Sequence, residues 1–499
     1  MPLQYTVSNH ESSGKTEMKK GVLARLVDWV RGAQSQVTNW ENVPLAQVQK
    51  AAKQGHAEAQ FHLGMMYGNG KRVAQDYQQA LAWVYKAAEQ GHAHAQYNLG
   101  AMYGMGLWGA DDSTQALPWL LKAATQNHAD AQILLGEMYA QGIRVAQDDQ
   151  QAVAWYRKAA EQGNANAQYN LGWMYSTGRG VAQDDQQALD WTRKAAEQGH
   201  AEALVSLRRT AEQGNARAQL NLGVMYATGQ GVEQDDQQAL DWTRKAAEQG
   251  NVLAQYNLGR MYSTGQGVEQ DDQQAVAWYR KAAEQGDVEA QFNLGVRYGD
   301  GQGVEQDDQQ AVAWTHKAAE QGHAMAQSNL GLMYERGQGV AQDDQQALAW
   351  TRKAAEQGNA QAQFNLGIRY ANGDVVEQDD QQAVAWYLKA AEQGYANAQF
   401  NLGWAYLNGH GVTEDRQQAL AWYSKAAEQG HADAQSMLGV MYGIAQDDRR
   451  AYFWSSVAAA NGSADAVINR DLSAKRLPPA VLEEVEVLIG EYVEQYRPR

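Results

Sequence analysis

Small and apolar residues recur at helical spacing in two short blocks, and this pair of blocks repeats along most of the chain. In residues 165–200 the first block predicts a helix, named helix A, whose inner face carries Ala165, Gln168, Leu171, Gly172 and Tyr175. A loop with Gly178 and Gly180 follows. The second block predicts helix B, with Ala188, Trp191, Ala195 and Ala196 on its apolar face. One unit is therefore a helical hairpin that buries its apolar face only against stacked neighbours.

The glycine that follows the leucine of helix A marks the period of the repeat. It recurs at Gly64, Gly100, Gly136, Gly172, Gly223, Gly259, Gly295, Gly331, Gly367, Gly403 and Gly439. The step is 36 residues everywhere except for one step of 51, between Gly172 and Gly223. A fixed period in this range indicates a solenoid. A glycine inside a helix costs about 1 kcal/mol relative to alanine, so its presence in every unit predicts that helix B approaches closely here.

The ends of helix B carry recognisable signals. Asp184 or Asp185 is placed to cap its N-terminus, where both acids also face the positive end of the helix dipole. Gly199 is placed to end the helix in the left-handed conformation. In the second unit, Pro118 stands where helix B should continue. Because proline costs roughly 3 kcal/mol inside a helix but is tolerated in its first turn, this helix B is predicted to start late or to kink.

These residues resemble a known family, the Sel1-like repeat proteins. The matching positions of one unit are Ala165, Ala167, Gln168, Leu171, Gly172, Tyr175, Gly178, Gly180, Val181, Asp185, Trp191, Lys194, Ala195, Ala196, Gln198 and Gly199. The resemblance covers roughly residues 57–462. It implies an all-α fold, a right-handed α/α superhelical solenoid of 36-residue helix-turn-helix repeats related to tetratricopeptide arrays. It also implies a family used mostly as adaptors and binding scaffolds in bacteria and in protein quality control.

The repeats predict one elongated domain. The predicted segments are a disordered N-terminal segment (1–20), N-terminal capping helices (21–56), four repeats (57–200), a truncated single-helix repeat (201–215), seven repeats (216–462) and C-terminal capping helices (463–499). The first capping helix, around Val22, Leu26 and Val30, has a membrane-surface helix as its alternative. The truncated repeat is interpreted either as a neutral deletion or as a selected hinge.

Charge and cysteine content exclude several classes of protein. Lys plus Arg number 41 and Asp plus Glu 58, so the formal net charge is −17. A chain this acidic is a poor partner for phosphate backbones or anionic membranes, and we expect no nucleic-acid partner. There is no cysteine, and hence neither a disulfide nor a thiolate metal site. This composition differs from the cysteine-rich secreted Sel1-like proteins, for which a β-lactam-binding or β-lactamase activity has been discussed.

The N-terminus lacks the pattern of a secretory signal. Residues 1–16 are polar, and the apolar stretch 21–30 is interrupted by Arg25 and Asp28. No segment is long and apolar enough to span a bilayer. A cytoplasmic location is expected, whereas translation from Met18 would make the start more signal-like and favour export.

Candidate catalytic and metal-binding residues have structural explanations. The histidines after the helix-ending glycine, such as His92 and His128, alternate with Asn, Asp and Tyr in other units and are interpreted as turn residues. The local group of His62, His92 and His94 is a weak metal candidate. The paired acids recur in almost every unit and are explained by helix capping. No nucleophile elbow, phosphate loop or His-Glu-x-x-His helix is present. We expect no enzyme activity, no cofactor and no metal, and we interpret the recurring tryptophan of helix B as core.

Two rows on helix A are candidates for recognition. The position two residues before the leucine carries aromatic side chains, among them Tyr97, Tyr169, Tyr256, Phe292, Phe364 and Phe400. The next position carries asparagines, among them Asn170, Asn257, Asn293 and Asn365. The rows resemble groove-facing positions of tetratricopeptide repeats, where an asparagine can bind a ligand's main chain. The alternative is that both rows only pack between repeats, and the sequence leaves this open.

The position after the glycine varies most, and it holds Trp173, Arg260 and Trp404. Other units do without tryptophan there, which favours a contact role. The chain is therefore predicted to be a non-enzymatic scaffold that binds a protein or peptide in a concave groove, as an adaptor or as a neutraliser of a toxin or effector. The alternatives are a secreted host-interaction protein that binds an extracellular glycoprotein and, disfavoured, a β-lactam-binding enzyme. The oligomeric state and the identity of the partner are left open.

Overall fold

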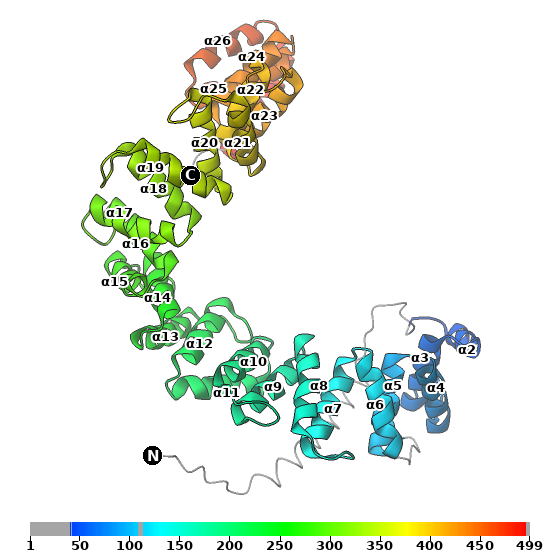
Figure 1. Ribbon diagram of the computed structural model, residues 1–499. Helices are drawn as coiled ribbons and strands as arrows, with labels where there is room; N and C mark the ends of the chain where they lie inside the picture. The colour runs from blue at the N-terminus through cyan, green and yellow to red at the C-terminus, as the bar shows by residue number, and fades with distance from the viewer. Residues whose placement is uncertain (1–39, 41, 108–112, 496–499) are drawn as a thin grey trace. The chain divides into compact units, whose positions relative to one another are not determined.

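The computed structural model describes residues 40, 42–107 and 113–495 (Figure 1). The predicted disordered segment 1–20 and the predicted amphipathic helix around Val22 to Val30 lie outside these residues. Within them the chain forms 26 α-helices and one 3-10 helix, and no strand. The predicted all-α class is confirmed. No helix in this part of the chain is both long and apolar enough to cross a bilayer.

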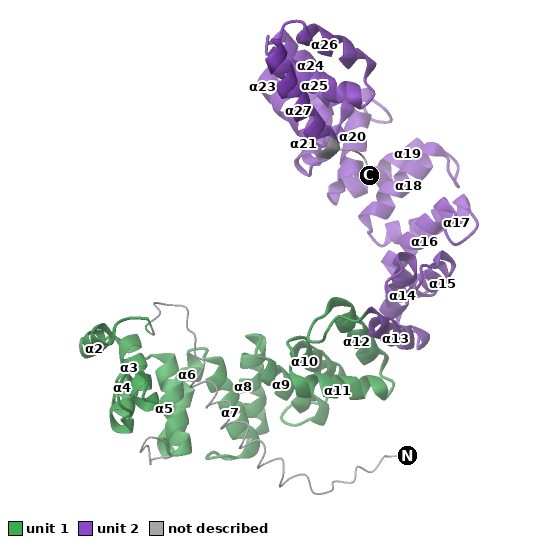
Figure 2. Ribbon diagram, turned by 180° about the vertical axis from the view of Figure 1, so that it is seen from behind, with its two compact units in different colours: residues 1–235 green, residues 236–499 purple. Residues whose placement is uncertain are grey.

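The chain divides into two compact units, residues 1–235 and 236–499 (Figure 2). The first unit contains α2 (Leu45–Lys53), α3 (Ala57–Asn69), α4 (Tyr77–Glu89), α5 (Ala93–Met105), η2 (Ser113–Gln115), α6 (Ala116–Thr125), α7 (Ala129–Gln141), α8 (Asp149–Glu161), α9 (Ala165–Thr177), α10 (Asp185–Glu197), α11 (Ala201–Glu212) and α12 (Ala216–Thr228). Within it, α11 is a single helix between the α9–α10 hairpin and α12.

The second unit continues the same alternation of helices A and B. It contains α13 (Asp236–Glu248), α14 (Val252–Thr264), α15 (Asp272–Glu284), α16 (Val288–Asp300), α17 (Asp308–Glu320), α18 (Ala324–Arg336), α19 (Asp344–Glu356), α20 (Ala360–Asn372), α21 (Asp380–Glu392), α22 (Ala396–Asn408), α23 (Arg416–Glu428), α24 (Ala432–Ile444), α25 (Asp448–Ala460), α26 (Ala464–Ala474) and α27 (Pro479–Gln495). At its end, α27 lies against the last repeat, where the Tyr452 hydroxyl of α25 donates to Glu486 at 3.2 Å, and it also reaches the repeat before, where the Tyr492 hydroxyl donates to the Ala427 carbonyl of α23 at 2.8 Å.

The repeated glycine of helix A is the point of closest approach between the two helices of a hairpin. A Cβ atom on Gly172 would lie 2.8 Å from Thr192 Oγ1 and 3.0 Å from the Ala188 carbonyl. On Gly136 it would lie 2.6 Å from the ring of Tyr156. Real Cβ atoms do not make such contacts, so only glycine fits. The predicted close approach of helix B is confirmed.

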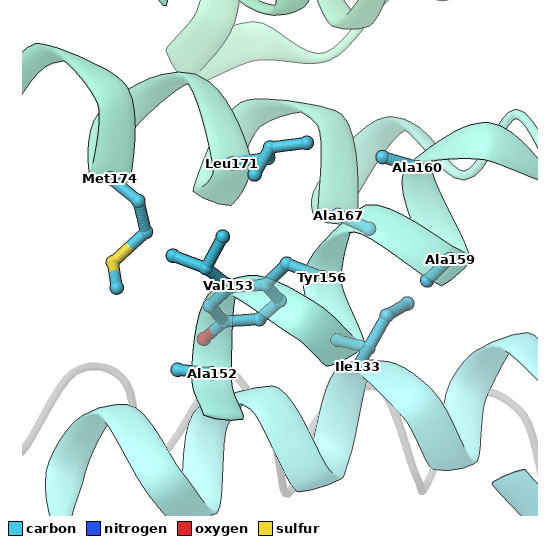
Figure 3. Close-up of a cluster of buried hydrophobic side chains, with 9 residues drawn as sticks. All are labelled: Ile133, Ala152, Val153, Tyr156, Ala159, Ala160, Ala167, Leu171 and Met174. Carbon is cyan, nitrogen blue, oxygen red and sulfur yellow. The ribbon is translucent and has the colours of Figure 1, made fainter. Parts of the chain in front are cut away.

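Each hydrophobic core is shared between consecutive repeats. Ile133 of α7, Val153 and Tyr156 of α8, and Leu171 and Met174 of α9 form one such cluster (Figure 3). The tryptophans of helix B are less uniformly core than predicted. Trp155 is buried, whereas the Trp191 ring is partly exposed and has the Lys194 ammonium above it, 4.1 Å from the ring centroid.

Two predicted helix boundaries are also confirmed. The helix containing Pro118 is preceded by the 3-10 turn η2 and begins only at Ala116, so the proline falls in its first turn. Gly199, after α10, has φ +82 and is left-handed as expected.

Of the two paired acids before helix B, the first is the N-cap. Asp184 accepts hydrogen bonds from the backbone N–H groups of Gln186 and Gln187, whereas Asp185 is the first residue of α10.

A buried glutamine links three consecutive helices in nearly every repeat. Gln168 of α9 donates from Nε2 to the Ala160 carbonyl of α8 at 3.2 Å, and its Oε1 accepts from Gln198 Nε2, after α10, at 2.7 Å. The same pair of bonds recurs at Gln60, Gln96, Gln132, Gln255, Gln291, Gln327, Gln363 and Gln399, and at Gln435 with Asn461 as the second donor. We name this row the glutamine ladder.

The histidines interpreted as turn residues begin helix A of the next repeat. His92, His128, His200, His323 and His431 each accept a hydrogen bond at Nδ1 from the backbone N–H three residues later. This bond places the imidazole proton on Nε2, which then faces the preceding repeat. His92 donates from Nε2 to Glu58 at 2.6 Å, and hydrogen bonds from His62 and His92 hold the pKa of Glu58 well below its usual range.

At the junction between the second and third repeats, His94 takes the place that Glu58 has at the preceding junction. His128 stacks on Tyr97, with ring centroids 4.8 Å apart, and meets the edge of His94 at 4.6 Å. Among the described atoms its Nε2 has no hydrogen-bond partner. Burial, and then the charge of His94, lowers the pKa of His128 to about 4, and burial lowers that of His94 as well.

Among the described residues, few other charged groups lie around this junction. His92, His62 and Glu58 lie on the side of the preceding repeat, and Asp130 lies on α7, where burial raises its pKa. Lys122, the one charged side chain of α6, lies over the Trp119 ring. Burial therefore favours the neutral forms of His94 and His128 at this junction.

We expect acid to weaken this junction in a defined pH window. Below pH 6.5 the unfolded chain binds a proton at His128 that the folded chain does not bind. The free energy of unfolding should therefore fall as the pH falls from 6.5 to about 4, by up to about 3 kcal/mol. His128→Asn keeps an N-cap, as Asn164 does one repeat later, and should reduce this loss. Amide hydrogen exchange of α5–α7 at neutral pH and near pH 4 measures it, and an equal acid response in both proteins would contradict the assignment.

We also expect the glutamine ladder to hold neighbouring helices together. Gln168→Leu removes the hydrogen bonds to the Ala160 carbonyl and from the Gln198 amide, and the loss of two such bonds should cost about 1–3 kcal/mol in total. Hydrogen exchange should accelerate in α8–α10 and stay unchanged in the second unit. The matched control is Gln186→Leu, at an exposed position of α10. Equal exchange in the two variants would show that the ladder contributes no stability.

Candidate functional site

The aromatic row of helix A lies between repeats. Tyr97, Tyr169, Phe292 and Phe400 stack on the N-cap histidine of the next helix A, with ring centroids 4.5–4.9 Å apart. Phe364 meets Tyr395, which takes the same place, at 5.2 Å. Tyr256 meets Tyr279 of α15 at 5.9 Å. Tyr97 is buried, and the other five rings are half-buried. Each ring therefore packs against a neighbour, and all six except Tyr97 keep part of their surface exposed.

The asparagine row is half-buried and partly engaged within the chain. Asn293 Nδ2 donates to the Glu289 carbonyl at 2.8 Å, and Asn365 Oδ1 accepts from Gln361 Nε2 at 3.0 Å. Asn170 and Asn257 are half-buried at the same position of α9 and α14. Both bonds lie within a single helix A, and whether the row packs between repeats or binds a ligand stays open.

The position after the glycine is the most exposed of the three. Trp173 on α9 is 43% exposed, Trp404 on α22 is 46% exposed, and Arg260 on α14 is also exposed. This position lies three and four residues beyond the asparagine and aromatic rows, so all three share one face of helix A. We name this face the helix A surface.

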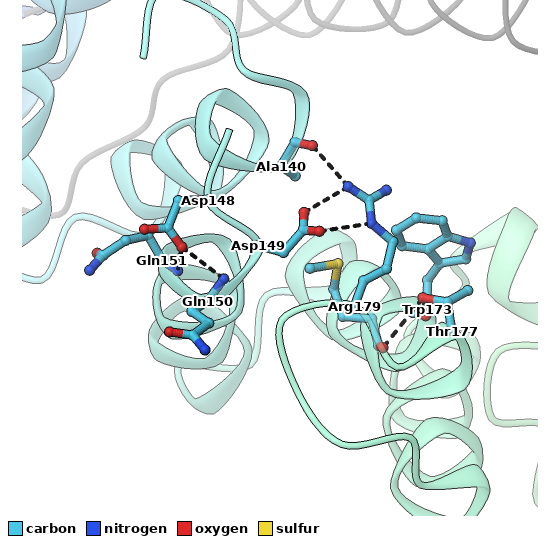
Figure 4. Close-up of polar contacts among 9 residues, drawn as sticks. Ala140, Asp148, Asp149, Gln150, Gln151, Trp173, Thr177 and Arg179 are labelled. Carbon is cyan, nitrogen blue, oxygen red and sulfur yellow. Dashed lines mark hydrogen bonds and ion pairs between the residues drawn. The ribbon is translucent and has the colours of Figure 1, made fainter. Parts of the chain in front are cut away.

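Trp173 is held by its own loop, which is anchored to the preceding repeat (Figure 4). The Arg179 guanidinium lies over the indole, 5.1 Å from the ring centroid. The same guanidinium donates to both carboxylate oxygens of Asp149, at 2.6 and 3.1 Å, and to the Ala140 carbonyl at 3.2 Å. Trp173, Arg179 and Asp149 form the Trp173 cluster, which spans two consecutive repeats.

Trp404 lies in a matching arrangement in the other unit. The imidazole of His410 stacks on the indole, with ring centroids 4.6 Å apart and planes only 9° apart. His410 Nδ1 lies 3.5 Å from Asp380 Oδ2, at the start of helix B of the preceding repeat. Trp404, His410 and Asp380 form the Trp404 cluster.

The second acid of each pair explains why the loop residue lies where it does. The second glycine of the loop packs on the backbone of that acid. A Cβ atom on Gly180, which has φ +68, would lie 2.0 Å from the Asp149 carbonyl, and one on Gly411 would lie 2.1 Å from that of Asp380. The loop is thereby fixed on the preceding helix B, and the residue between its two glycines reaches the carboxylate.

Sequence reasoning found both tryptophans but missed their partners. A signal was present, since six loops have the form Gly-x-Gly and x is glutamine in the four whose helix A lacks tryptophan at the exposed position. The two loops in which x is arginine or histidine are those of Trp173 and Trp404. No group of three or more His, Cys, Asp or Glu that could hold a metal occurs in the described part of the chain.

A family model of a helical repeat matches this chain eleven times, and each match begins where a helix A begins. The model of the Sel1 repeat matches residues 57–92, 93–128, 129–164, 165–200, 216–251, 252–287, 288–323, 324–359, 360–395, 396–431 and 432–463. Residues 201–215, which contain α11, fall between two matched repeats. The comparison with curated proteins found no match.

Two solved structures show the same repeats. The chain is 39% identical to a protective antigen of uropathogenic Escherichia coli with an SLR fold; the match covers 92% of this chain and 96% of that one, with a TM-score of 0.56. It is 36% identical to a Sel1 repeat protein from Oxalobacter formigenes, over 65% of this chain and 90% of that one, with a TM-score of 0.45. The matched repeats span most of the sequence, and the chain belongs to the Sel1 repeat family.

Proposed function

We propose that this protein is a non-enzymatic scaffold that binds a protein or peptide partner through the helix A surface. Repeats of this family generally mediate protein–protein interaction, and the exposed tryptophans supply the specific support. Trp173 and Trp404 each leave more than two fifths of their surface in solvent. Both are nevertheless held by a stacked neighbour and an anchored loop. Tryptophan is enriched among the residues that dominate binding energy at protein interfaces.

The remaining residues of the helix A surface suit a supporting role in this proposal. Arg260 lies exposed at the same position of α14 as Trp173 on α9. The half-buried rings of Tyr169, Tyr256, Phe292, Phe364 and Phe400 and the amides of Asn170, Asn257, Asn293 and Asn365 border the exposed position. Tyr97 is buried, so its contribution is to hold the junction with His128 in place. An adaptor and a neutraliser of an effector both use such a surface.

We expect the double substitution Trp173→Ala, Trp404→Ala to weaken partner binding by roughly 30-fold or more without changing the fold. Crosslinking capture from the native cell identifies the protein held by the wild type, and titration calorimetry with the purified partner then measures affinity. Loss of a central tryptophan contact of about 2 kcal/mol or more raises the Kd by roughly 30-fold.

The matched control for this experiment is Val224→Ala, Leu332→Ala, which truncates the same helix position in two other repeats. Unchanged helicity and hydrogen exchange show that each variant is folded. An unchanged Kd for the tryptophan variant would remove the helix A surface as the binding site at these positions, and the search would turn to the loops and to α11.

A second candidate function places the same surface outside the cytoplasm, where it would bind a host glycoprotein. Its support is the likeness to the Escherichia coli protective antigen, which extends over nearly the whole of both chains. Fractionation of the native cell with an antibody against the chain separates the two candidates. A signal in the medium or at the cell surface, lost when residues 18–30 are deleted, supports export. A signal confined to the cytoplasmic fraction supports the intracellular scaffold.

A further inference from the structure

The two exposed tryptophans have partners that no other comparable repeat has. Six repeats share the Gly-x-Gly loop, and the exposed position before it holds Trp173, Val224, Arg260, Val296, Leu332 or Trp404. Where tryptophan is present, the loop residue is Arg179 or His410. In the other four repeats it is Gln230, Gln266, Gln302 or Gln338. The exchange of the loop residue accompanies the tryptophan in both units.

Glutamine already suffices to anchor the loop. Gln266 Nε2 donates to Asp236 at 3.0 Å, and Gln338 Nε2 donates to Asp308 at 3.1 Å. These acids are the equivalents of Asp149 and Asp380. Arg179 and His410 therefore contribute something beyond anchoring. What they add is a flat group over one face of the indole.

The stacked group limits the rotamers of the tryptophan and affects which groups the other face of its ring can attract. An exposed tryptophan without a stacked neighbour samples several rotamers, and ordering it on binding costs conformational entropy. A guanidinium above one face already uses the attraction of the ring for cations. In the Trp173 cluster Asp149 balances the charge of the guanidinium, but a second cation on the other face of the ring still gains less, because the first already draws on the electrons of the ring. The other face of Trp173 is therefore better matched by a neutral, apolar group.

We infer that Arg179 and His410 are positioning residues that hold Trp173 and Trp404 as rigid platforms, and that the other face of the Trp173 platform accepts a proline ring or an aliphatic side chain of the partner rather than a basic side chain. The inference rests on the proposed function, because it names the partner chemistry of that same surface. The preference at Trp173 follows from the guanidinium that already occupies one face of its indole.

The test uses the full chain labelled with 5-fluorotryptophan. The ¹⁹F resonances of the two residues are assigned from Trp173→Phe and Trp404→Phe. Two probes, N-acetyl-prolinamide and N-acetyl-lysinamide, are titrated separately at millimolar concentration. We expect the proline probe to shift both resonances saturably and to leave that of buried Trp155 in place. The lysine probe should shift the Trp173 resonance at least several-fold less at the same concentration. Equal or stronger binding of the lysine probe overturns the inferred chemistry.

The positioning role is tested with Arg179→Gln, which converts this loop to the glutamine type and keeps the means to bond Asp149. The Trp173 resonance should move and its proline-probe affinity should fall several-fold, while Trp404 serves as an internal control. The matched surface control is Arg193→Gln, which removes a guanidinium that pairs with Glu197 on α10. An unchanged Trp173 titration in Arg179→Gln overturns the positioning role.

Partner affinity separates this inference from the proposed function. If Trp173→Ala loses the partner while Arg179→Gln binds it as tightly as the wild type does, the helix A surface is supported as the binding site and the positioning role of Arg179 is contradicted. If Trp173→Ala, Trp404→Ala binds the partner as the wild type does, the proposed function fails. Loss of affinity in both Trp173→Ala and Arg179→Gln supports the function and the platform together.

Discussion

The glutamine ladder is the interaction on which the regularity of this solenoid depends. A helical hairpin of small residues offers little shape to distinguish one stacking register from another, since alanine and glycine make up much of each contact. A buried amide is different, because it costs free energy unless its donor and acceptor are both satisfied. The donor and the acceptor of Gln168 are both paired only when α8 and the residue after α10 lie at the positions relative to α9 that these two hydrogen bonds require. Repetition of the same pair of bonds carries that arrangement from hairpin to hairpin within each unit.

Because the ladder and the glycine contact fix the inner face of helix A, the outer face is free to differ between repeats. The helix position after the glycine shows this freedom, with Trp173, Arg260 and Trp404 on otherwise similar helices. The rings of the aromatic row lie between the two faces, where they pack on the next N-cap and still reach solvent. Binding specificity can therefore change at single positions while the stacking of the array is preserved.

Much of the fold follows from the spacing of residues within one unit. The helical period, the close approach at Gly172 and the late start of the helix at Pro118 are all local consequences of sequence, and each is found as expected. The glutamine was assigned to the apolar face, because spacing shows which face a side chain occupies and not whether its amide is paired. Stacking of Tyr169 on His200, or of Arg179 on Trp173, depends on how two separate segments are brought together, which no single helical pattern reveals.

The short repeat at α11 shows which contacts the array needs in order to continue. Its N-terminal end has the character of helix A, with His200 as N-cap, but Leu204 replaces the ladder glutamine. Its C-terminal end has the character of helix B, since Arg208 bonds the Tyr226 hydroxyl as Arg157 bonds that of Tyr175. The ladder resumes at once, because Gln219 donates to the Ala211 carbonyl. Nearby, Gly231 packs on the Ala196 carbonyl rather than on an acid. The single helix α11 thus takes the place of a hairpin. The glutamine ladder is interrupted once, at Leu204, and α12 packs on α11 as another helix A packs on the helix B before it.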